Sequence, residues 1–311
     1  MGKTAFLFPG QGAQYAGMGK GFYDNVTVSK AAFDEASEAA GLDVPALAFE
    51  ENIRLNITEY TQIAMVATEV ALLRALEERG ISCDYAAGHS LGEYSAMTAV
   101  GAIKQFDTFA LVRKRGIFMQ EAYPEGGAMS AVLGAEEALI DEAIEGVEGI
   151  VSVANYNCPG QIVITGEEEA VKKVSEKLTE KGVKKIVPLK VSGPFHSALM
   201  KGAGERLKEE LVNINIANPR VPYIANLTAE EVKEASDIPG LLAAQLSGPV
   251  LWTQTIKNLI TSGVDTFVEI GPGKTLAGFN KRIDRNVRTV NIDKYENFEE
   301  AVAELARGEA G

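Results

Sequence analysis

The chain has 311 residues, of which 46% are hydrophobic and 23% charged, and its formal net charge is −13. These values are typical of a globular protein with one large domain, or of a domain with an insert. The negative charge argues against nucleic-acid binding, which requires clustered Lys and Arg side chains. No apolar run approaches about 18 residues, the length that indicates a transmembrane helix, so we expect no membrane partner.

Targeting signals and metal-binding patterns are not expected either. The apolar stretch at the N-terminus is too short for a signal peptide. The cysteines, Cys83 and Cys158, form neither a CxxC motif nor a disulfide framework, and we interpret both as buried thiols in a reducing cytoplasm. The two histidines, His89 and His196, come without a cluster of further ligands, so no metal site is predicted.

From the N-terminus, the pattern of apolar residues alternates between strands and helices. Short apolar runs bounded by Gly or Pro indicate strands, and apolar residues at three- and four-residue spacing indicate helices. The first part of the chain is predicted to contain a strand at 4–8, a helix at 62–79, a strand at 83–87, a helix from Gly92 and a helix at 107–120. Ser90 therefore lies at a strand-to-helix turn.

The middle of the chain has a different order of elements. Its predicted elements are a strand at 128–133, a helix at 135–146, strands at 150–154 and 161–165, a helix at 167–182 and a strand at 183–191. The order β-α-β-β-α-β is the ferredoxin-like arrangement. Thr165 and Glu168 have the spacing of a capping box at the start of the second helix.

The remainder of the chain returns to alternating helices and strands. It is predicted to contain a helix from Ser197, a strand at 223–225, a helix near Leu241, a helix from Trp252, a strand at 266–270 and a helix from Lys274. We therefore expect an α/β fold with a parallel sheet and an inserted small subdomain. The predicted boundaries are 1–125 and 198–311 for the large subdomain and 126–197 for the insert.

Ser90 is central to the stretch AGHSLG at residues 87–92. Gly88 and Gly92 permit a sharp turn and a close approach of strand and helix, which leaves the hydroxyl exposed at the strand end. The free N–H groups and partial positive charge at the start of the following helix suit a developing oxyanion. Ser90 is therefore predicted to be a nucleophile, and the alternative is a helix N-cap.

A serine nucleophile needs a base within hydrogen-bond reach. His89 adjoins Ser90, but in such a turn the neighbouring side chain points away. His196 lies in a loop with Gly and Pro where the insert rejoins the large subdomain, so it can reach the cleft; the alternative is a structural histidine. Asp107 and Asp141 lie between the two in sequence, but both are predicted on helix surfaces, so no acid completes a triad.

The loop PGQG at residues 9–12 follows the first predicted strand. It does not match the phosphate-binding pattern GxGxxG, because Tyr15 stands where the third glycine belongs. We interpret it as a turn that presents backbone N–H groups beside Ser90. The amides of Gln11 and Leu91 are then predicted to form an oxyanion hole.

Two arginines, Arg113 and Arg115, lie in the helix at 107–120 among apolar residues. A basic side chain in such surroundings needs an anionic partner. That partner is either internal, with Glu93 as a candidate, or the carboxylate of a substrate, which a guanidinium can hold with two hydrogen bonds. Periodicity does not choose between the two arginines.

Seven motifs taken together are more specific than any one of them. In chain order they are PGQG, GHSLGEYSA, RKRGIFMQ, GAMSAVLG, NYNCPGQIVITG, SGPFHSALM and VEIGPGKTLAGF. Over nearly the whole chain, this set resembles the malonyl-CoA:acyl carrier protein transacylase family of type II fatty-acid synthesis. The resemblance implies an α/β-hydrolase-like large subdomain with a ferredoxin-like insert.

The resemblance also implies a role for each matching residue. Ser90 is expected to be the nucleophile that malonate acylates, and His196 the general base and then the general acid. Gln245, in AAQLSGPVLW, matches the position whose backbone carbonyl orients the histidine, which accounts for the missing acid. Arg115, immediately before Gly116, is expected to bind the malonyl carboxylate.

The implied reaction is ping-pong transfer of a malonyl group from malonyl-CoA to the phosphopantetheine thiol of acyl carrier protein, in the cytoplasm. Coenzyme A and phosphopantetheine belong to the substrates, and no bound cofactor is expected. Two other classes remain as alternatives. One is a serine thioesterase or esterase with the same nucleophile and base, and the other is a non-catalytic module that binds acyl carrier protein.

Overall fold

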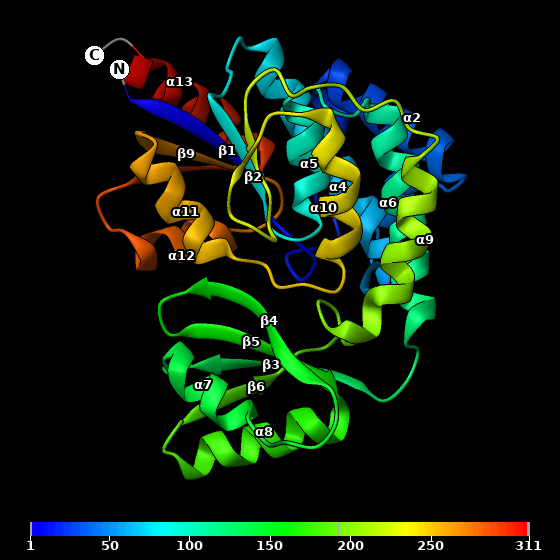
Figure 1. Cartoon of the computed structure of the whole chain (residues 1–311). Helices are drawn as coiled ribbons and strands as arrows, with labels where there is room; N and C mark the ends of the chain where they lie inside the picture. Colours follow the sequence, from blue (N-terminus) through cyan, green and yellow to red (C-terminus); the bar gives the residue numbers. More distant parts are fainter. Residues whose placement is uncertain (1, 192, 310–311) are drawn as a thin grey trace.

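The computed structural model describes residues 2–191 and 193–309, and the strands in these ranges form two separate sheets (Figure 1). The larger sheet has six strands in the order β10-β9-β1-β2-β7-β8. They are β1 (Lys3–Phe8), β2 (Tyr85–Gly88), β7 (Tyr223–Ile224), β8 (Glu231–Val232), β9 (Val264–Ile270) and β10 (Arg288–Ile292). Neighbouring strands run parallel except β7 and β8. The predicted α/β class with a mostly parallel sheet is confirmed.

Helices cover both faces of this sheet, because successive residues of a strand point to opposite faces. Phe6 and Phe8 contact one helical layer, and Ala5 and Leu7 contact the other. The first layer contains α1 (Lys20–Asn25), α2 (Thr27–Ala40), α3 (Val44–Phe49), α4 (Thr58–Glu78), α5 (Gly92–Ala99), α6 (Gln105–Ala122), α9 (Lys201–Leu211), α10 (Ile238–Gln245) and α13 (Phe298–Glu309). The second contains α11 (Trp252–Thr261) and α12 (Thr275–Ile283). None of the helices within the described ranges is long and apolar enough to cross a membrane.

The long helix α4 begins earlier than predicted. The apolar periodicity predicts a start at Gln62, but the helix runs from Thr58 to Glu78. Thr58 and Thr61 of its first turn are buried, and Thr61 Oγ1 donates to the carbonyl oxygens of Leu55 and Ile57 at 2.7 and 3.0 Å. Because the buried residues of this turn are threonines rather than apolar residues, the spacing of apolar residues misplaces the helix start.

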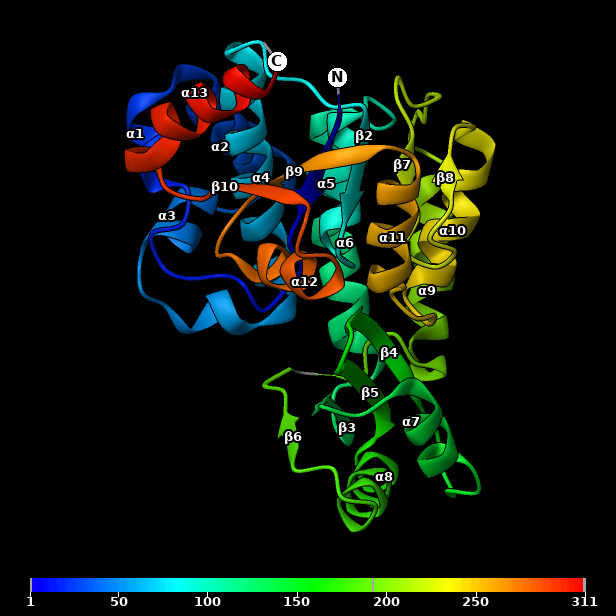
Figure 2. The ribbon, with the colours of Figure 1, turned by 90° about the vertical axis from the view of Figure 1, so that its left-hand side faces the viewer.

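The smaller sheet belongs to a subdomain that lies below the large one in Figure 1 and in the rotated view of Figure 2. Its elements are β3 (Gly127–Leu133), α7 (Glu137–Ile144), β4 (Val151–Cys158), β5 (Gln161–Glu167), α8 (Glu168–Glu180) and β6 (Lys185–Pro188). The strand order is β4-β5-β3-β6, and every pair is antiparallel. This confirms the predicted ferredoxin-like subdomain, which has a hydrophobic core of its own.

The capping box predicted from Thr165 and Glu168 is wrong. Thr165 lies in β5, and α8 begins at Glu168 with Glu167 as its N-cap and without a side-chain cap. Thr165 Oγ1 instead donates to the carbonyl oxygen of Phe195 at 2.8 Å. The sheet register places this hydroxyl under the loop that carries His196, and that tertiary bond replaces the local cap.

Backbone hydrogen bonds join the two subdomains. Val250, which precedes α11, donates to the carbonyl oxygen of Ala154 at 2.8 Å and accepts from Tyr156 N at 2.9 Å.

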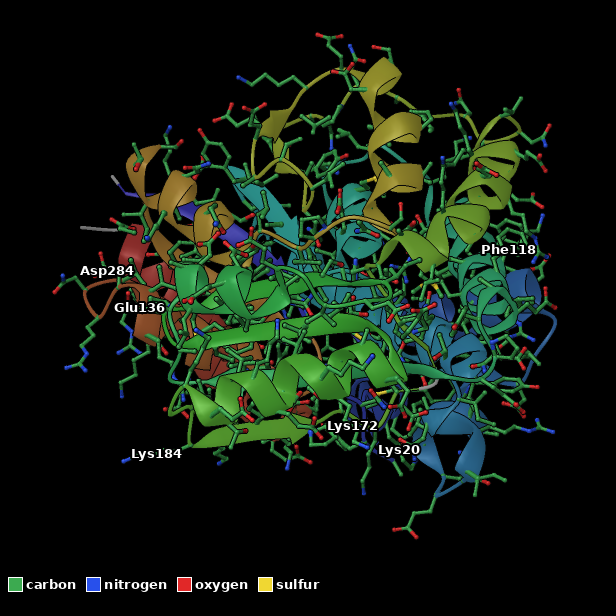
Figure 3. The ribbon with its side chains drawn as sticks, turned by 60° about the horizontal axis from the view of Figure 1, so that its bottom comes forward. Lys20, Phe118, Glu136, Lys172, Lys184 and Asp284 are labelled. Carbon is green, nitrogen blue, oxygen red and sulfur yellow. The ribbon has the colours of Figure 1, made fainter. Side chains whose placement is uncertain are left out.

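With the small subdomain facing the viewer, Figure 3 shows Lys172 of α8 and Lys184 on its outer side. The boundaries at residues 126 and 197 stay a prediction, and Ser192 lies outside the described residues.

Two glycines allow α5 to pass close to the centre of the large sheet. A Cβ on Gly88 would lie 1.9 Å from the carbonyl carbon of Gly92, and one on Gly92 would lie 2.2 Å from the carbonyl oxygen of Phe8. Both neighbours are backbone atoms, which cannot move without shifting a strand or a helix. The turn between β2 and α5 therefore requires glycine on both sides of Ser90.

We expect Gly92→Ala to lower the free energy of unfolding by roughly 1–3 kcal/mol or more, since the added methyl group displaces packed backbone. Thermal denaturation measures this loss. The control is Gly202→Ala in α9, where a Cβ meets nothing within 4 Å; that change should be neutral or stabilise by about 0.4–1 kcal/mol. Equal melting temperatures for the Gly92 variant and the parent would contradict the packing described here.

Candidate active site

Ser90 lies at the tip of the turn between β2 and α5. Its backbone φ is 51°, in the left-handed region that residues other than glycine rarely adopt. Asn226, two residues after the end of β7, stabilises this conformation from both sides. Its Oδ1 accepts from Ser90 N at 2.6 Å, and its Nδ2 donates to the carbonyl oxygen of Gly88 at 2.6 Å. A strained backbone persists where its surroundings fix it in this way.

The hydroxyl of Ser90 contacts a histidine rather than capping the helix. The N-cap of α5 is Leu91, without a side-chain cap, so the N-cap alternative for Ser90 is wrong. Ser90 Oγ lies 2.8 Å from His196 Nε2. The structure thus brings together the serine and the histidine that the sequence analysis paired.

His196 lies in the loop between the two subdomains, is 4% exposed and has a left-handed φ of 64°. Its backbone N–H donates to Leu246 O at 3.0 Å. Its Nδ1 lies 2.9 Å from Gln245 O and 3.1 Å from Gly248 O. Carbonyl oxygens only accept, so Nδ1 carries the proton and Nε2 is left to accept from Ser90 Oγ. The carbonyl oxygen of Gln245 thus lies within hydrogen-bond distance of the imidazole, and its predicted orienting role stays a proposal.

The imidazole of His196 is held in its neutral form. Burial, followed by the positive charge of Arg115, lowers the pKa of His196 to about 4. A neutral imidazole with a free Nε2 lone pair can accept a proton at neutral pH. The arrangement is therefore suited to deprotonating the hydroxyl of Ser90.

Arg115, on α6, is 1% exposed and faces Ser90. Its Nη1 donates to Gln62 Oε1 at 2.8 Å, and its Nη2 donates to Gln245 Oε1 at 3.1 Å and to Ser90 Oγ at 3.3 Å. The guanidinium also lies over the ring of Tyr94, 5.2 Å from the centroid. All these partners are neutral, and Arg115 forms no ion pair with the residues that the structure describes. The internal salt bridge with Glu93 is not found.

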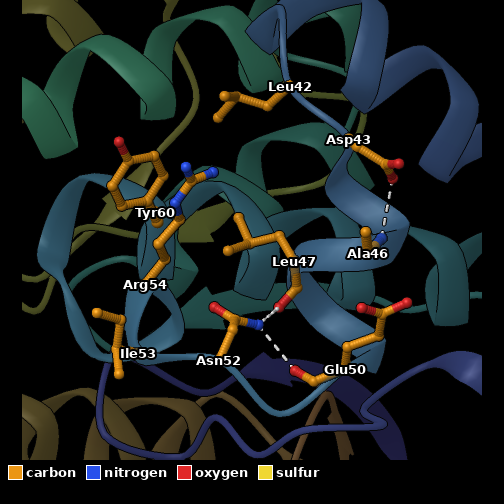
Figure 4. A pocket seen from close by; sticks show the side chains of 9 residues that line it. All are labelled: Leu42, Asp43, Ala46, Leu47, Glu50, Asn52, Ile53, Arg54 and Tyr60. Carbon is orange, nitrogen blue, oxygen red and sulfur yellow. Dashed lines mark hydrogen bonds between the residues drawn. The ribbon is translucent and has the colours of Figure 1, made fainter.

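Arg113 points to a different part of the molecule. Its Nη1 forms an ion pair with Glu59 Oε2 at 2.8 Å, and its guanidinium lies 4.9 Å from the centroid of the Tyr60 ring. Tyr60 lines a separate pocket of about 310 Å³ beside α3, together with residues such as Leu47 and Arg54 (Figure 4). None of the residues that line this pocket belongs to the Ser90 site. The geometry therefore selects Arg115 for that site.

The loop with Gln11 lies against the turn that carries Ser90. A Cβ on Gly10 would lie 2.6 Å from the carbonyl oxygen of His89, and Gln11 Nε2 donates to Thr58 Oγ1 at 3.1 Å. Within residues 2–191 and 193–309, neither the Gln11 nor the Leu91 amide N–H donates to a protein acceptor. Both amides are thus available to an oxyanion, and their predicted role stays a proposal.

His89 faces away from the site, as expected. Its Nε2 lies 2.8 Å from Asn157 Oδ1, and its ring contacts Trp252 at 5.6 Å between centroids. Asp107 and Asp141 lie on α6 and α7, also as expected. The described residues contain no group of three or more His, Cys, Asp or Glu side chains that could hold a metal ion.

Two polar side chains of the site, Asn226 and Gln62, are not among the residues predicted from the sequence. Asn226 could have been found, because it directly follows a predicted strand of a parallel sheet, where functional residues gather. Gln62 lies at the start of a predicted helix, and nothing in the local pattern indicates that it faces Arg115. Glu93 is predicted from the sequence only as a candidate partner of Arg115, whereas it contacts Asn226 and Gln245.

Comparisons with known proteins identify the family of this α/β protein with its paired serine and histidine. The chain belongs to the acyl transferase domain family, whose model matches residues 5–294. It is 46% identical over 310 residues to the malonyl CoA-acyl carrier protein transacylase of Bacillus subtilis strain 168, with 98% of each chain covered. The resemblance inferred from the motifs is confirmed.

Solved structures agree with this assignment. The malonyl CoA-acyl carrier protein transacylase from Clostridium perfringens superposes with a TM-score of 0.95 at 45% identity, covering 99% of this chain and 98% of that one. A malonyl-transacylase solved in complex with its type II polyketide synthase acyl-carrier protein gives a TM-score of 0.94 at 38% identity, covering 97% and 99%. The fold and the family thus agree over the full length.

The lowered pKa of His196 can be measured directly, because the chain contains only two histidines. Burial also lowers the pKa of His89. Since a lowered pKa keeps the imidazole neutral until the pH falls to that value, we expect His196 not to titrate between pH 8 and about 5.5, and His89 to titrate below its ordinary pKa. The measurement is an NMR titration of the imidazole C–H signals, assigned with His89→Gln. An inflection of the His196 signal near its ordinary pKa would contradict the buried, cation-facing environment.

Proposed function

We propose that this protein transfers a malonyl group from malonyl-CoA to the phosphopantetheine thiol of acyl carrier protein in fatty-acid synthesis. The observation that carries the proposal is the 2.8 Å contact between Ser90 Oγ and His196 Nε2, with Arg115 Nη2 3.3 Å from the same hydroxyl. A nucleophile beside a base and a buried cation suits an acyl group that carries its own carboxylate. The malonyl transacylases found among the relatives support the same substrate and partner.

In the first half of the reaction, Ser90 Oγ attacks the thioester carbonyl carbon of malonyl-CoA while His196 Nε2 accepts the hydroxyl proton. The carbonyl oxygen becomes an oxyanion, and the amides of Gln11 and Leu91 donate to it. The carbon–sulfur bond then breaks, and the proton on His196 passes to the sulfur of coenzyme A. The product is a malonyl ester of Ser90.

In the second half, the phosphopantetheine thiol of acyl carrier protein takes the place of coenzyme A. His196 Nε2 accepts the thiol proton as the sulfur attacks the ester carbonyl of malonyl-Ser90. When the bond to Ser90 Oγ breaks, His196 returns the proton to the serine. Gln245 O and Gly248 O hold the Nδ1–H of the imidazole in the same tautomer throughout.

Arg115 provides the selectivity for malonate. Its guanidinium is buried and has only neutral protein partners. A substrate carboxylate would supply the missing negative charge and accept two hydrogen bonds in the plane of the guanidinium. A substrate without that carboxylate, such as acetyl-CoA, leaves the buried charge uncompensated.

No bound metal or redox cofactor takes part in this proposal, because Ser90 supplies the nucleophile and His196 moves the protons. Coenzyme A and phosphopantetheine enter as parts of the two substrates. We place the enzyme in the cytoplasm, since Cys83 and Cys158 are both free thiols, as suits a reducing compartment.

The proposal is tested by incubating the protein with malonyl-CoA alone and mapping the adduct by mass spectrometry. We expect a stable malonyl group on Ser90 that a pantetheine thiol removes. Ser90→Ala should abolish the adduct and change stability by only about 1 kcal/mol. Rapid hydrolysis without a lasting adduct would favour a thioesterase, and no adduct at all would favour a carrier-binding module. An adduct on Ser95 or Ser197 would overturn the assignment of the nucleophile.

We expect Arg115→Ala to lower kcat/KM for malonyl-CoA about a hundred- to five-thousandfold, because roughly 3–5 kcal/mol is lost when one partner of a buried charge pair is removed. Acetyl transfer should be unharmed. The matched control is Arg113→Ala, in the same helix, which should leave the malonyl to acetyl ratio unchanged because Arg113 pairs with Glu59. Equal losses for both substrates in the Arg115 variant would assign that residue a structural role only.

A further inference from the structure

Glu93 is a buried acid next to the site that the proposed reaction does not use. It lies in the first turn of α5, three residues after Ser90, and is 1% exposed. One oxygen, Oε2, accepts from Gln245 Nε2 at 2.7 Å and from Asn226 N at 3.2 Å. The carboxylate thus contacts the two residues that surround Ser90, without contacting Ser90 or Arg115 through a hydrogen bond of its own.

The contact with Gln245 determines how that side-chain amide is turned. Gln245 Nε2 donates both to Glu93 Oε2 and to the carbonyl oxygen of Ser90, at 2.7 and 2.9 Å. Both partners are acceptors, so the NH2 group has to face them. The amide oxygen of Gln245 is therefore turned the other way, where it accepts from Arg115 Nη2 at 3.1 Å. The chain of contacts runs from Glu93 through Gln245 to Arg115.

Protonation of the carboxyl group does not break this chain. Burial raises the pKa of Glu93 to about 7, while the hydrogen bonds from Gln245 and Asn226 and the charge of Arg115 act in the opposite direction. Both donors contact the same oxygen, Oε2. A proton taken up by Glu93 therefore sits on Oε1 and leaves the two hydrogen bonds in place.

We propose that Glu93 is a positioning residue for malonyl selectivity: through the side-chain amide of Gln245 it holds the Arg115 guanidinium in the orientation that receives the malonyl carboxylate. The inference rests on the proposed function, because it assumes that Arg115 binds that carboxylate. It adds a residue that touches neither substrate nor the reacting atoms. The other contact of Glu93, with Asn226 N, supports the residue that holds Ser90, so it affects every acyl group alike.

The two contacts of Glu93, with Asn226 and with Gln245, are expected to affect the two substrates differently, and the experiment measures that difference. Loss of the contact with Asn226 slows malonyl and acetyl transfer by the same factor, since both use Ser90. Loss of the contact with Gln245 slows malonyl transfer more than acetyl transfer, since only the malonyl group has a carboxylate for Arg115 to bind. The ratio of malonyl to acetyl adduct formation on Ser90, measured in single-turnover reactions by mass spectrometry, therefore isolates the action of Glu93 on Arg115.

We expect Glu93→Ala to lower that ratio about tenfold, the effect of losing one hydrogen bond to a charged group. Glu93→Gln keeps an oxygen that can accept from Gln245 and Asn226, and it should restore the ratio to within about twofold of the parent. Asn226→Ala should slow both substrates and leave the ratio unchanged. Glu69→Gln is the matched control, because Glu69 is fully buried in α4 but accepts from Ser95 and belongs to the core; it should not change the ratio.

A folded Glu93→Ala variant with an unchanged ratio would overturn the inference, as would a Glu93→Gln variant that is as unselective as Glu93→Ala. If the alanine variant does not fold, Glu93→Asp takes its place: its carboxylate is one methylene shorter and cannot reach both donors, so the same drop in ratio is expected. A parent protein that forms no malonyl-Ser90 refutes the proposed function itself. That outcome is distinct from a parent that forms it and variants that keep its ratio.

Discussion

The site depends on one constraint: the buried guanidinium of Arg115 forms no ion pair with a carboxylate among the described residues. Removing a charge from water is unfavourable unless other groups solvate it, and burial accordingly lowers the pKa of Arg115. The amide oxygens of Gln62 and Gln245 and the face of the Tyr94 ring compensate part of that cost. What remains is a positive charge directed at Ser90 Oγ, which favours an anionic acyl group there. The same charge helps to keep His196 neutral.

In the proposed catalytic pair, the histidine serves as a base without an acid behind it. A carboxylate at Nδ1 would raise the pKa of the imidazole, whereas a backbone carbonyl orients the ring without adding charge. Gln245 O and Gly248 O orient the ring of His196 in this way. Ser90 and His196 both have left-handed backbone conformations. Each is held by hydrogen bonds from a distant segment, so the short contact between them is built in before substrate arrives.

The site is assembled from segments that lie far apart in the chain. Ser90 follows β2 and Asn226 follows β7, which are neighbouring parallel strands whose carboxyl ends meet at one edge of the sheet. The helices α4, α6 and α10 bring Gln62, Arg115 and Gln245 to the same edge. The small subdomain helps to position the site rather than to supply reacting groups, since Thr165 supports the loop that carries His196. Glu93 then connects the turn that carries Ser90 to Arg115 through Gln245.

The sequence by itself determined the features whose causes are local. Glycines on both sides of Ser90 indicate the turn, and the order of apolar runs indicates a parallel α/β sheet with a ferredoxin-like insert. Periodicity left Arg113 and Arg115 open, and only the resemblance favoured Arg115; the tertiary structure shows which of them faces Ser90. Two positions along a helix are about 200° apart, so the two arginines face opposite sides, yet apolar residues flank both. The tertiary structure also revealed Asn226, whose partner Ser90 is 136 residues away in the chain. A hydrogen bond between residues so far apart leaves no periodic trace in the sequence, because it depends on which strands and helices become neighbours.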